Sequence, residues 1–182
     1  ADRADFEGAI DVATRRIDHM NGFMKRFADV VRIPPPARRD CDLPRLLDGL
    51  ARLMAGEAER RAISLRVEVA AVPPTVRADP DLIEQALVNV LRNAMEAVER
   101  GGAVVLRLYR DGAERVLEVQ DSGPGLPAGA RGMLFTPFFT TKEKGQGIGL
   151  TVVREILDGH GFAFDLDGPA GGPTRFRIFL GA

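Results

Sequence analysis

The sequence has 182 residues, with 25 lysines and arginines against 26 aspartates and glutamates, and a formal charge of −1 at pH 7. This balance argues against nucleic-acid binding as the main role, because surfaces that bind DNA or RNA are strongly basic. One cysteine, Cys41, cannot form an internal disulfide, and with two histidines it cannot complete a zinc site. This cysteine usage indicates a reducing compartment, so we expect a cytoplasmic domain. No apolar run approaches the ~18 residues of a membrane span, so we expect the segment to be soluble.

A long helix is the first predicted element. Apolar residues between Phe6 and Val31 recur in alternating steps of four and three, the spacing of a helix packed in a coiled coil or bundle. The prolines at 34–36 end this helix, and the polar stretch after them has the composition of a linker. The predicted organisation is a helical segment over residues 1–36, a linker over 37–42 and a globular domain over 43–182.

The predicted domain mixes helices and strands. Asp79 and Pro80 supply an N-cap and a first-turn proline for its central helix, and Asp111-Gly112 is a favoured hairpin turn. The pattern predicts an α+β fold in which helices cover one face of a mixed sheet. The expected helices cover residues 43–60, 79–100 and 148–157, and the expected strands cover 63–69, the neighbourhood of Val76, 103–110, 115–120, 162–166 and 174–180.

A pair of asparagines on the central helix is the first candidate site. Gln85, Asn89, Asn93 and Glu96 fall on one face of this helix, opposite an apolar face. Asparagine is a poor helix former, but two of them at i and i+4 can present carbonyl oxygens to one point. Mg²⁺ accepts such oxygens together with phosphates and water. A solvated polar face is the alternative interpretation of this pair.

Asp121 follows directly on a predicted strand and opens the run Asp-Ser-Gly-Pro-Gly. A carboxylate at a strand end can accept a hydrogen bond from an exocyclic amine, and Gly123 and Gly125 permit turns and close approach of a ligand. Adenine carries such an amine, whereas guanine carries an oxygen in the corresponding place. An ordinary Asx turn is the alternative interpretation of this short motif.

A second glycine cluster precedes the last predicted helix. Gly145, Gly147 and Gly149, interleaved with Gln146 and Ile148, place backbone N–H groups at the positive end of the helix dipole, where phosphate is favoured. The cluster is neither a Walker A loop nor a Rossmann fingerprint.

Between the two glycine clusters lies the run Phe-Thr-Pro-Phe-Phe-Thr-Thr-Lys, from Phe135 to Lys142. Exposed aromatic side chains in this loop could close over a ligand, and Lys142 offers a cation to phosphates. The phenylalanines could equally be core residues beneath the loop.

The order and spacing of these segments resemble the ATP-binding domain of sensor histidine kinases, in the superfamily shared with gyrase B, MutL and the heat-shock chaperone ATPases. The resemblance extends over residues 43–180 and implies a Bergerat-type fold, a two-layer α/β sandwich. The aromatic run looks most like the nitrogen-regulatory branch (NtrB and NtrY types), and the segment before residue 37 is similar to the second helix of its dimerisation hairpin. Residues 89–94 resemble the N box, 121–125 the G1 box, 135–142 the F box and 145–150 the G2 box.

The resemblance implies ATP and Mg²⁺ as cofactors and assigns roles to individual residues. Asn93 would ligate Mg²⁺, and Asn89 would assist at the metal or its water. Asp121 would bind the adenine amine, Lys142 would approach the phosphates, and Thr174 would close the adenine end. The other residues implied in nucleotide binding are Gly123, Gly125, Phe135, Thr141, Gly145, Gly147, Ile148, Gly149 and Leu150.

The phosphoacceptor motif of that family, histidine followed by an acid, arginine and proline, does not occur in the sequence. His19 looks like a helix-surface residue and His160, between two glycines, like a turn residue. The resemblance therefore implies a chain that binds ATP and ADP but does not autophosphorylate efficiently alone. In an intact homodimer, the γ-phosphoryl would pass to a histidine and then to the aspartate of a response-regulator receiver domain. Membrane contact is expected only through parts absent from this sequence.

Two other functions stay open at this point. One is a regulatory module that responds to ATP without transferring phosphate, and the other is a serine kinase or an ATP-operated clamp of the same superfamily. A clamp would carry a catalytic glutamate where Asn89 stands, and the heptad helix followed by three prolines favours the histidine kinase.

Overall fold

The computed structural model describes residue 14 and residues 33–127, 129–142 and 147–181. The chain divides into two compact units, Ala1–Pro34 and Pro35–Ala182. Apart from Thr14, which is helical, the helix predicted over residues 6–31 lies outside the described residues, as does His19. None of the helices in the described ranges is both long and apolar enough to cross a membrane.

The second unit has helices and strands close to the predicted ones. In the described part of the chain its elements are β1 (Arg39–Asp42), α2 (Leu43–Arg60), β2 (Ser64–Val69), β3 (Thr75–Ala78), α3 (Pro80–Ala97), β4 (Ala103–Asp111), β5 (Glu114–Asp121), the 3-10 turn η1 (Arg131–Met133), α4 (Gly149–His160), β6 (Ala163–Asp167) and β7 (Thr174–Phe179).

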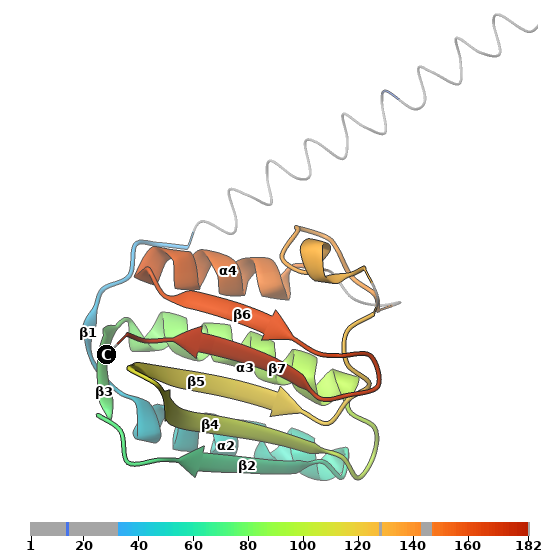
Figure 1. The fold of residues 1–182 in the computed structure, drawn as a ribbon, viewed down its shortest axis with the longest axis horizontal. Coiled ribbons are helices and arrows are strands. Elements are labelled where there is room, and N and C mark those ends of the chain that lie inside the picture. The colour runs from blue at the N-terminus through green and yellow to red at the C-terminus, as the bar shows by residue number, and fades with distance from the viewer. Residues whose placement is uncertain (1–13, 15–32, 128, 143–146, 182) are drawn as a thin grey trace, which may run out of the picture. The chain divides into compact units, whose positions relative to one another are not determined.

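Five of the strands form one mixed sheet with the order β2-β4-β5-β7-β6 (Figure 1). β2 and β4 are parallel, and the other neighbours are antiparallel. Helices α2 and α3 lie behind the sheet in the view of Figure 1, and α4 lies along β6. The predicted α+β fold, a two-layer sandwich with a mixed sheet, is confirmed.

The core lies between the helices and one face of the sheet. Val104, Leu106 and Leu108 alternate along β4 and are at most 1% exposed, because every second side chain of a strand points to the same face. Their pairing partners on β5 include Val119 and Leu117, which are buried on that same face. Burial of these apolar side chains is the main stabilising term of the domain.

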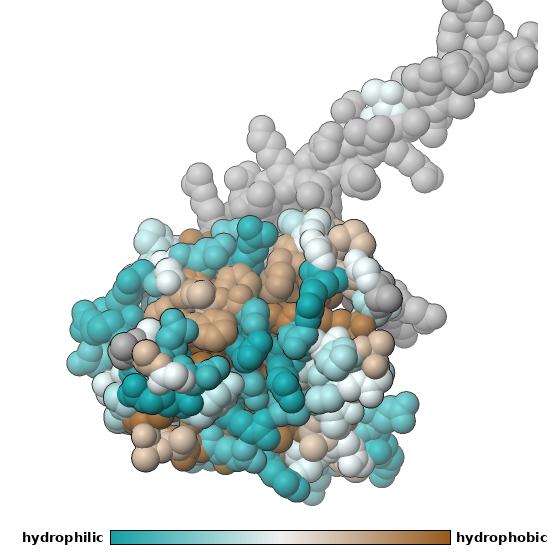
Figure 2. Space-filling model, viewed as in Figure 1, coloured by the Kyte–Doolittle hydropathy of each residue, from teal (hydrophilic) through white to brown (hydrophobic). Residues whose placement is uncertain are grey.

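The opposite face of the sheet is polar and is seen directly in Figure 2, where hydrophilic side chains cross its centre. Arg107 bridges Glu68 at 2.7 Å and Glu118 at 3.1 Å, and Arg177 pairs with Asp165 at 2.6 Å. This alternation of an apolar and a charged face explains why the strands could be recognised in the sequence.

The predicted linker is partly wrong. Residues 39–42 form β1, which pairs antiparallel with β3 from Arg39 opposite Ala78 to Asp42 opposite Thr75. Cys41 in this strand is 2% exposed, and burial, with a smaller effect of Asp42, raises the pKa of its thiol. Because Arg-Asp-Cys-Asp has no apolar alternation, the strand depends on backbone pairing that the sequence pattern does not reveal.

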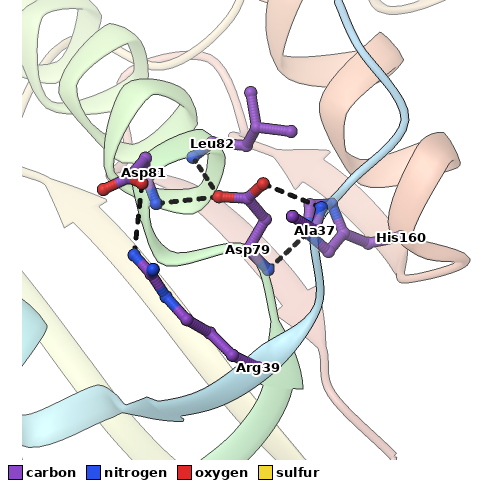
Figure 3. A network of polar contacts seen from close by, with 6 residues as sticks. All are labelled: Ala37, Arg39, Asp79, Asp81, Leu82 and His160. Atoms are coloured by element: carbon purple, nitrogen blue, oxygen red, sulfur yellow. Dashed lines mark hydrogen bonds and ion pairs between the residues drawn. The ribbon is translucent and has the colours of Figure 1, made fainter.

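Helix α3 begins at the N-cap Asp79, as predicted, and ends at Ala97, three residues before the expected end. The Oδ1 atom of Asp79 accepts hydrogen bonds from the backbone N–H groups of Asp81 at 3.1 Å and Leu82 at 3.3 Å. Its Oδ2 atom accepts from the N–H of Ala37 at 2.9 Å (Figure 3). One carboxylate therefore caps the helix and fixes the segment that enters the domain.

His160 is the last residue of α4 and is 3% exposed, which corrects its prediction as a turn residue. The turn is made by the next residue, Gly161, which has a left-handed φ of 68°. The Nε2 atom of His160 accepts a hydrogen bond from the backbone N–H of Asp79 at 3.0 Å (Figure 3), so Nδ1, 2.7 Å from the carbonyl oxygen of Ile156, carries the proton. A buried neutral imidazole thus joins the end of α4 to the start of α3.

Replacing Asp79 with alanine should lower the free energy of unfolding by about 1 to 2 kcal/mol at pH 7, the usual cost of losing an N-cap. Partial burial opposes ionisation, but the hydrogen bonds from the N–H groups of Ala37, Leu82 and Asp81 outweigh it and lower the pKa of Asp79. The contribution of Asp79 is therefore complete above about pH 3.9, the pKa of an unfolded aspartate, and is lost as the pH falls through the lower folded pKa.

Urea denaturation of the wild type and the D79A variant at several pH values measures this effect. The D79N variant is the matched control, because it keeps a capping oxygen and removes the charge, so its stability loss should be smaller. Equal stability of the wild type and D79A at pH 7 would contradict the capping role.

Candidate functional site

A cavity of about 700 Å³ lies between α3, the sheet and the loop that joins β5 to α4. This volume is in the range of sites that bind molecules of nucleotide size. Segments far apart in the sequence meet in it, from α3, the end of β5, the start of β7, the loop and the start of α4. The predicted site residues that line it are Asn89, Asn93, Asp121, Gly125, Thr141, Lys142, Gly147, Ile148, Gly149, Leu150 and Thr174.

Asp121 forms a buried acceptor at the wall of the cavity. It is 5% exposed, and the pairing of β5 with β7 places it opposite Thr174. Its Oδ1 atom accepts the backbone N–H of Gly123 at 2.8 Å. Burial raises the pKa of Asp121, although hydrogen bonds from Gly123 and Thr174 act in the opposite direction. A buried carboxylate of this kind suits a ligand that brings a hydrogen-bond donor.

Asn89 and Asn93 lie one turn apart on α3 and both line the cavity. The Nδ2 atom of Asn89 donates to the carbonyl oxygen of Gln85 at 3.0 Å, and its Oδ1 faces the start of α4, where a β-carbon on Gly149 would lie 3.4 Å away. The Oδ1 atom of Asn93 accepts a hydrogen bond from Nζ of Lys142 at 3.2 Å. The Nδ2 atom of Asn93 faces the same start of α4, 3.9 Å from the place of a β-carbon on Gly149, so the two amide groups line one part of the cavity.

The donor set at this part of the cavity fits a hard cation. Amide oxygens combined with phosphate oxygens and water are the ligands that Mg²⁺ prefers. Within the described ranges, no group of three or more His, Cys, Asp or Glu side chains could hold a metal ion. A metal bound at Asn89 and Asn93 would therefore depend on oxygens that a ligand brings with it.

The glycines serve close contacts of the chain with itself. Gly125 has a φ of 79°, and a β-carbon there would lie 2.0 Å from the carbonyl oxygen of Pro169. Gly147 has a φ of 67°, and a β-carbon there would lie 2.4 Å from the backbone of Phe138. These positions accept only glycine because both the conformation and the space exclude a side chain. Both glycines line the cavity, but they are required because the neighbouring backbone is close, and not because a ligand needs the space.

Two predicted site residues, Gly123 and Phe135, do not line the cavity, and a third, Gly145, cannot be placed. Gly123 lies outside its lining, but its N–H holds the Asp121 carboxylate. Phe135 is half-buried and packs edge-on against Phe164, with ring centroids 5.2 Å apart, and its ring lies 6.5 Å from that of Phe176, so it packs on other aromatic side chains instead of lining the cavity. Gly145 lies outside the described residues.

Some lining residues were missed by the sequence reasoning. Phe139 lines the cavity in place of Phe135, and Glu96 and Arg92 of α3 line it beside Asn93. Glu96 lies on the polar face of α3 in the sequence, three residues after Asn93, which was an available signal. Phe135 and Phe139 could not be distinguished, because both belong to one aromatic run without periodicity.

Comparison with known proteins identifies the family. The family model for "Histidine kinase-, DNA gyrase B-, and HSP90-like ATPase" matches residues 78–182. The chain belongs to this ATPase family. The match includes α3, β5, the start of α4 and β7, which are the elements that build the cavity.

Curated members of this ATPase family are similar over most of the chain. The sensor histidine kinase ZraS of Escherichia coli O157:H7 is 32% identical over 169 residues, which are 93% of this chain and 37% of ZraS. The nitrogen regulation protein NtrY of Azorhizobium caulinodans is 33% identical over 192 residues, which cover 100% of this chain and 24% of NtrY. The resemblance to sensor histidine kinases, including the NtrY type, is confirmed. The chain spans little more than a third of ZraS and about a quarter of NtrY.

Solved structures of this ATPase family share the fold. Full-length ShkA in complex with AMPPNP is 31% identical with a TM-score of 0.71, over 80% of this chain and 32% of ShkA. The histidine kinase ThkA in complex with the response regulator protein TrrA has a TM-score of 0.70 over 94% of this chain and 50% of that chain. At 23% identity, the ThkA complex supports the fold alone.

Proposed function

We propose that this chain is the ATP-binding catalytic domain of a two-component sensor histidine kinase, and that it binds ATP together with Mg²⁺. The observation that supports this most directly is that one cavity is lined by the buried Asp121 and by the asparagine pair of α3. The Asp121 carboxylate suits the amine of adenine, and the asparagine pair suits a hard cation bound together with phosphates. ShkA, a relative with a solved structure, was solved in complex with AMPPNP. We propose the cytoplasm as the location of this domain.

Each residue has a role in this proposal. Asp121 accepts a hydrogen bond from the adenine amine, and Thr174 beside it closes that end of the pocket. Asn89 and Asn93 would hold Mg²⁺ through their amide oxygens, and the chemistry that Mg²⁺ would supply there is neutralisation of charge on the phosphates. Lys142 and the N–H groups at the start of α4 face the phosphate oxygens. Positioning and charge neutralisation account for most of the catalysis in phosphoryl transfer, so this domain needs no general base.

The phosphoryl acceptor in this proposal is a histidine that this sequence does not contain. His160 is excluded because it is 3% exposed and both of its ring nitrogens are engaged. The γ-phosphoryl would pass in line to a nitrogen of a histidine on the dimerisation helices of the homodimeric parent protein, leaving ADP. A response-regulator receiver domain would then accept the phosphoryl group on an aspartate.

Calorimetric titration of this chain with a non-hydrolysable ATP analogue tests the proposal. Saturable binding that requires Mg²⁺ and exceeds the binding of the matching GTP analogue is the expected result. The absence of saturable binding with Mg²⁺ present would refute it, and equal binding of the two analogues would refute the adenine assignment of Asp121.

A further inference from the structure

Glu96 is a carboxylate of the cavity to which the proposed function gives no role. It lies on α3 three residues after Asn93, so both side chains point to the same side of the helix. Both contact one lysine, because Nζ of Lys142 donates to Oδ1 of Asn93 at 3.2 Å and forms an ion pair with Oε2 of Glu96. Three side chains thus form a cluster that joins α3 to the β5–α4 loop.

The loop backbone supports this arrangement. The N–H of Lys142 donates to Oγ1 of Thr140 at 3.1 Å, which fixes the turn that presents the lysine. Phe139, a little earlier in the loop, lines the same cavity, and its N–H donates to the carbonyl oxygen of Thr136 at 3.1 Å. Lys142 therefore reaches α3 from a part of the loop that has hydrogen bonds of its own.

The positions of the other charged side chains explain why Lys142 pairs with Glu96 and not with Asp121. Among the described residues that line the cavity, the carboxylates are Glu96 and Asp121, and the cationic side chains are Arg92 and Lys142. Asp121 is held by Gly123 and Thr174 at the end of β5, so Glu96 is the carboxylate with which Lys142 pairs. The ammonium group lies against an amide oxygen and a carboxylate, which are oxygens that a metal cation also accepts.

The Lys142–Glu96 pair is accessible enough to exchange partners. The side chain of Lys142 is 40% exposed and that of Glu96 is 48% exposed. Ion pairs this open to solvent contribute little stability, because water and salt screen them. The contact can therefore hold the lysine in the absence of a ligand and still yield when phosphates and a metal compete for the same groups.

We infer that Glu96 is a positioning residue that makes the site prefer metal-bound over metal-free nucleotide, an inference that rests on the proposed function. Without nucleotide, Glu96 holds Lys142 beside Asn93, so the lysine charge is already neutralised. A metal-free nucleotide has to remove Lys142 from Glu96 and leaves an unpaired carboxylate near its own phosphates. With a nucleotide that carries Mg²⁺, the oxygens of Asn93 and Glu96 would face the metal cation in place of the lysine, and Lys142 would be available to the phosphates.

The Glu96→Gln substitution tests this inference through binding, with calorimetric titration of a non-hydrolysable ATP analogue in Mg²⁺ and in EDTA. We expect the affinity in EDTA to rise about two- to fivefold, within the range of effects that partly exposed ion pairs have. The affinity in Mg²⁺ should change less, so the preference for the metal-bound form should shrink. An unchanged ratio of the two affinities would overturn the inference.

A second measurement does not depend on nucleotide. In the nucleotide-free E96Q variant, amide hydrogen exchange over residues 135–142 should be faster than in the wild type, because the loop loses its tie to α3. Unchanged exchange there would contradict the contact itself. This result stands even if the wild type binds no nucleotide, an outcome that would refute the proposed function instead.

Two further variants give the controls. Glu99→Gln removes the same charge from the exposed residue two positions after α3, outside the cavity lining, and should change neither measurement. The double variant E96Q/K142Q, measured together with the single variant K142Q, tests whether Glu96 acts through the lysine, because groups that act together give non-additive effects. Purely additive effects of the two substitutions on the EDTA affinity would mean that Glu96 does not work through Lys142.

Discussion

Nucleotide binding should lose its dependence on Mg²⁺ when Asn93 is replaced with alanine. The amide oxygen of Asn93 lies on the cavity side of α3, one turn after Asn89, and alanine removes it without disturbing the helix. Because even the supporting partners of metal ligands contribute about 10- to 100-fold to metal affinity, a direct ligand should cost at least about tenfold in nucleotide affinity measured with Mg²⁺. Calorimetric titration of an ATP analogue in Mg²⁺ and in EDTA measures the nucleotide affinity with and without the metal.

Gln85→Ala is the matched control for this variant. It removes an amide from the same face of α3, while the backbone carbonyl that holds Asn89 remains in place. Its Mg²⁺ dependence should resemble that of the wild type. If the N93A variant kept a normal response to Mg²⁺, Asn93 would have to be removed from the proposed metal site.

Selectivity for adenine should fall when Asp121 is replaced with asparagine. A hydrogen bond to a charged acceptor is worth about 1.5 to 3 kcal/mol, so the ATP analogue should bind roughly 10- to 100-fold more weakly. The new amide N–H₂ group can donate to the oxygen that guanine carries in place of the amine, so the GTP analogue should bind better than it does to the wild type. Titration with both analogues gives the ratio of affinities.

The pH dependence of the Asp121 variant separates binding from folding. Because burial raises the pKa of Asp121, the carboxylate is lost on acidification at a higher pH than for an ordinary aspartate. ATP-analogue affinity of the wild type should fall in that acidic range, whereas the affinity of D121N should not. The raised pKa also means that the ionised group destabilises the nucleotide-free domain above the usual aspartate pKa, so D121N should unfold at no lower temperature than the wild type.

Asp165→Asn is the control for the Asp121 variant, because it removes one carboxylate charge from the open face of the sheet, where Asp165 pairs with Arg177. Its nucleotide selectivity should be unchanged. Equal ratios of ATP to GTP affinity in the wild type and D121N would exclude the adenine contact.

Much of the fold could be predicted because its local signals agree with its tertiary structure. Asp79 and Pro80 start α3 where the sequence indicates, and a two-residue turn joins β4 to β5 one residue later than predicted, at Gly112-Ala113 instead of Asp111-Gly112. The strands were recognisable because the sheet has one apolar and one charged face. The end of α4 was placed three residues too early because the sequence does not show that His160 is held by the N–H of Asp79, 81 residues away.

The site could be predicted in outline but not in its contacts. Spacing within each motif placed Asn89, Asn93 and Asp121 on suitable elements, and their meeting in one cavity follows from the pairing of β5 with β7 and the packing of α3. The pattern could not show which glycines face a cavity and which face the chain's own backbone. It also gave no sign that Lys142 would pair with Glu96, because that contact joins residues 46 positions apart in the sequence.

Strand β1 has a consequence for any attempt to excise the domain. A fragment that begins at Leu43 would leave β3 as an unpaired edge, and exposed strand edges recruit other chains and promote aggregation. Such a fragment would also expose the buried surface that Cys41 covers and remove Ala37 from the Asp79 carboxylate. A fragment that begins at Pro35 keeps the compact unit whole, so we expect it to be the shortest version that stays monodisperse during purification.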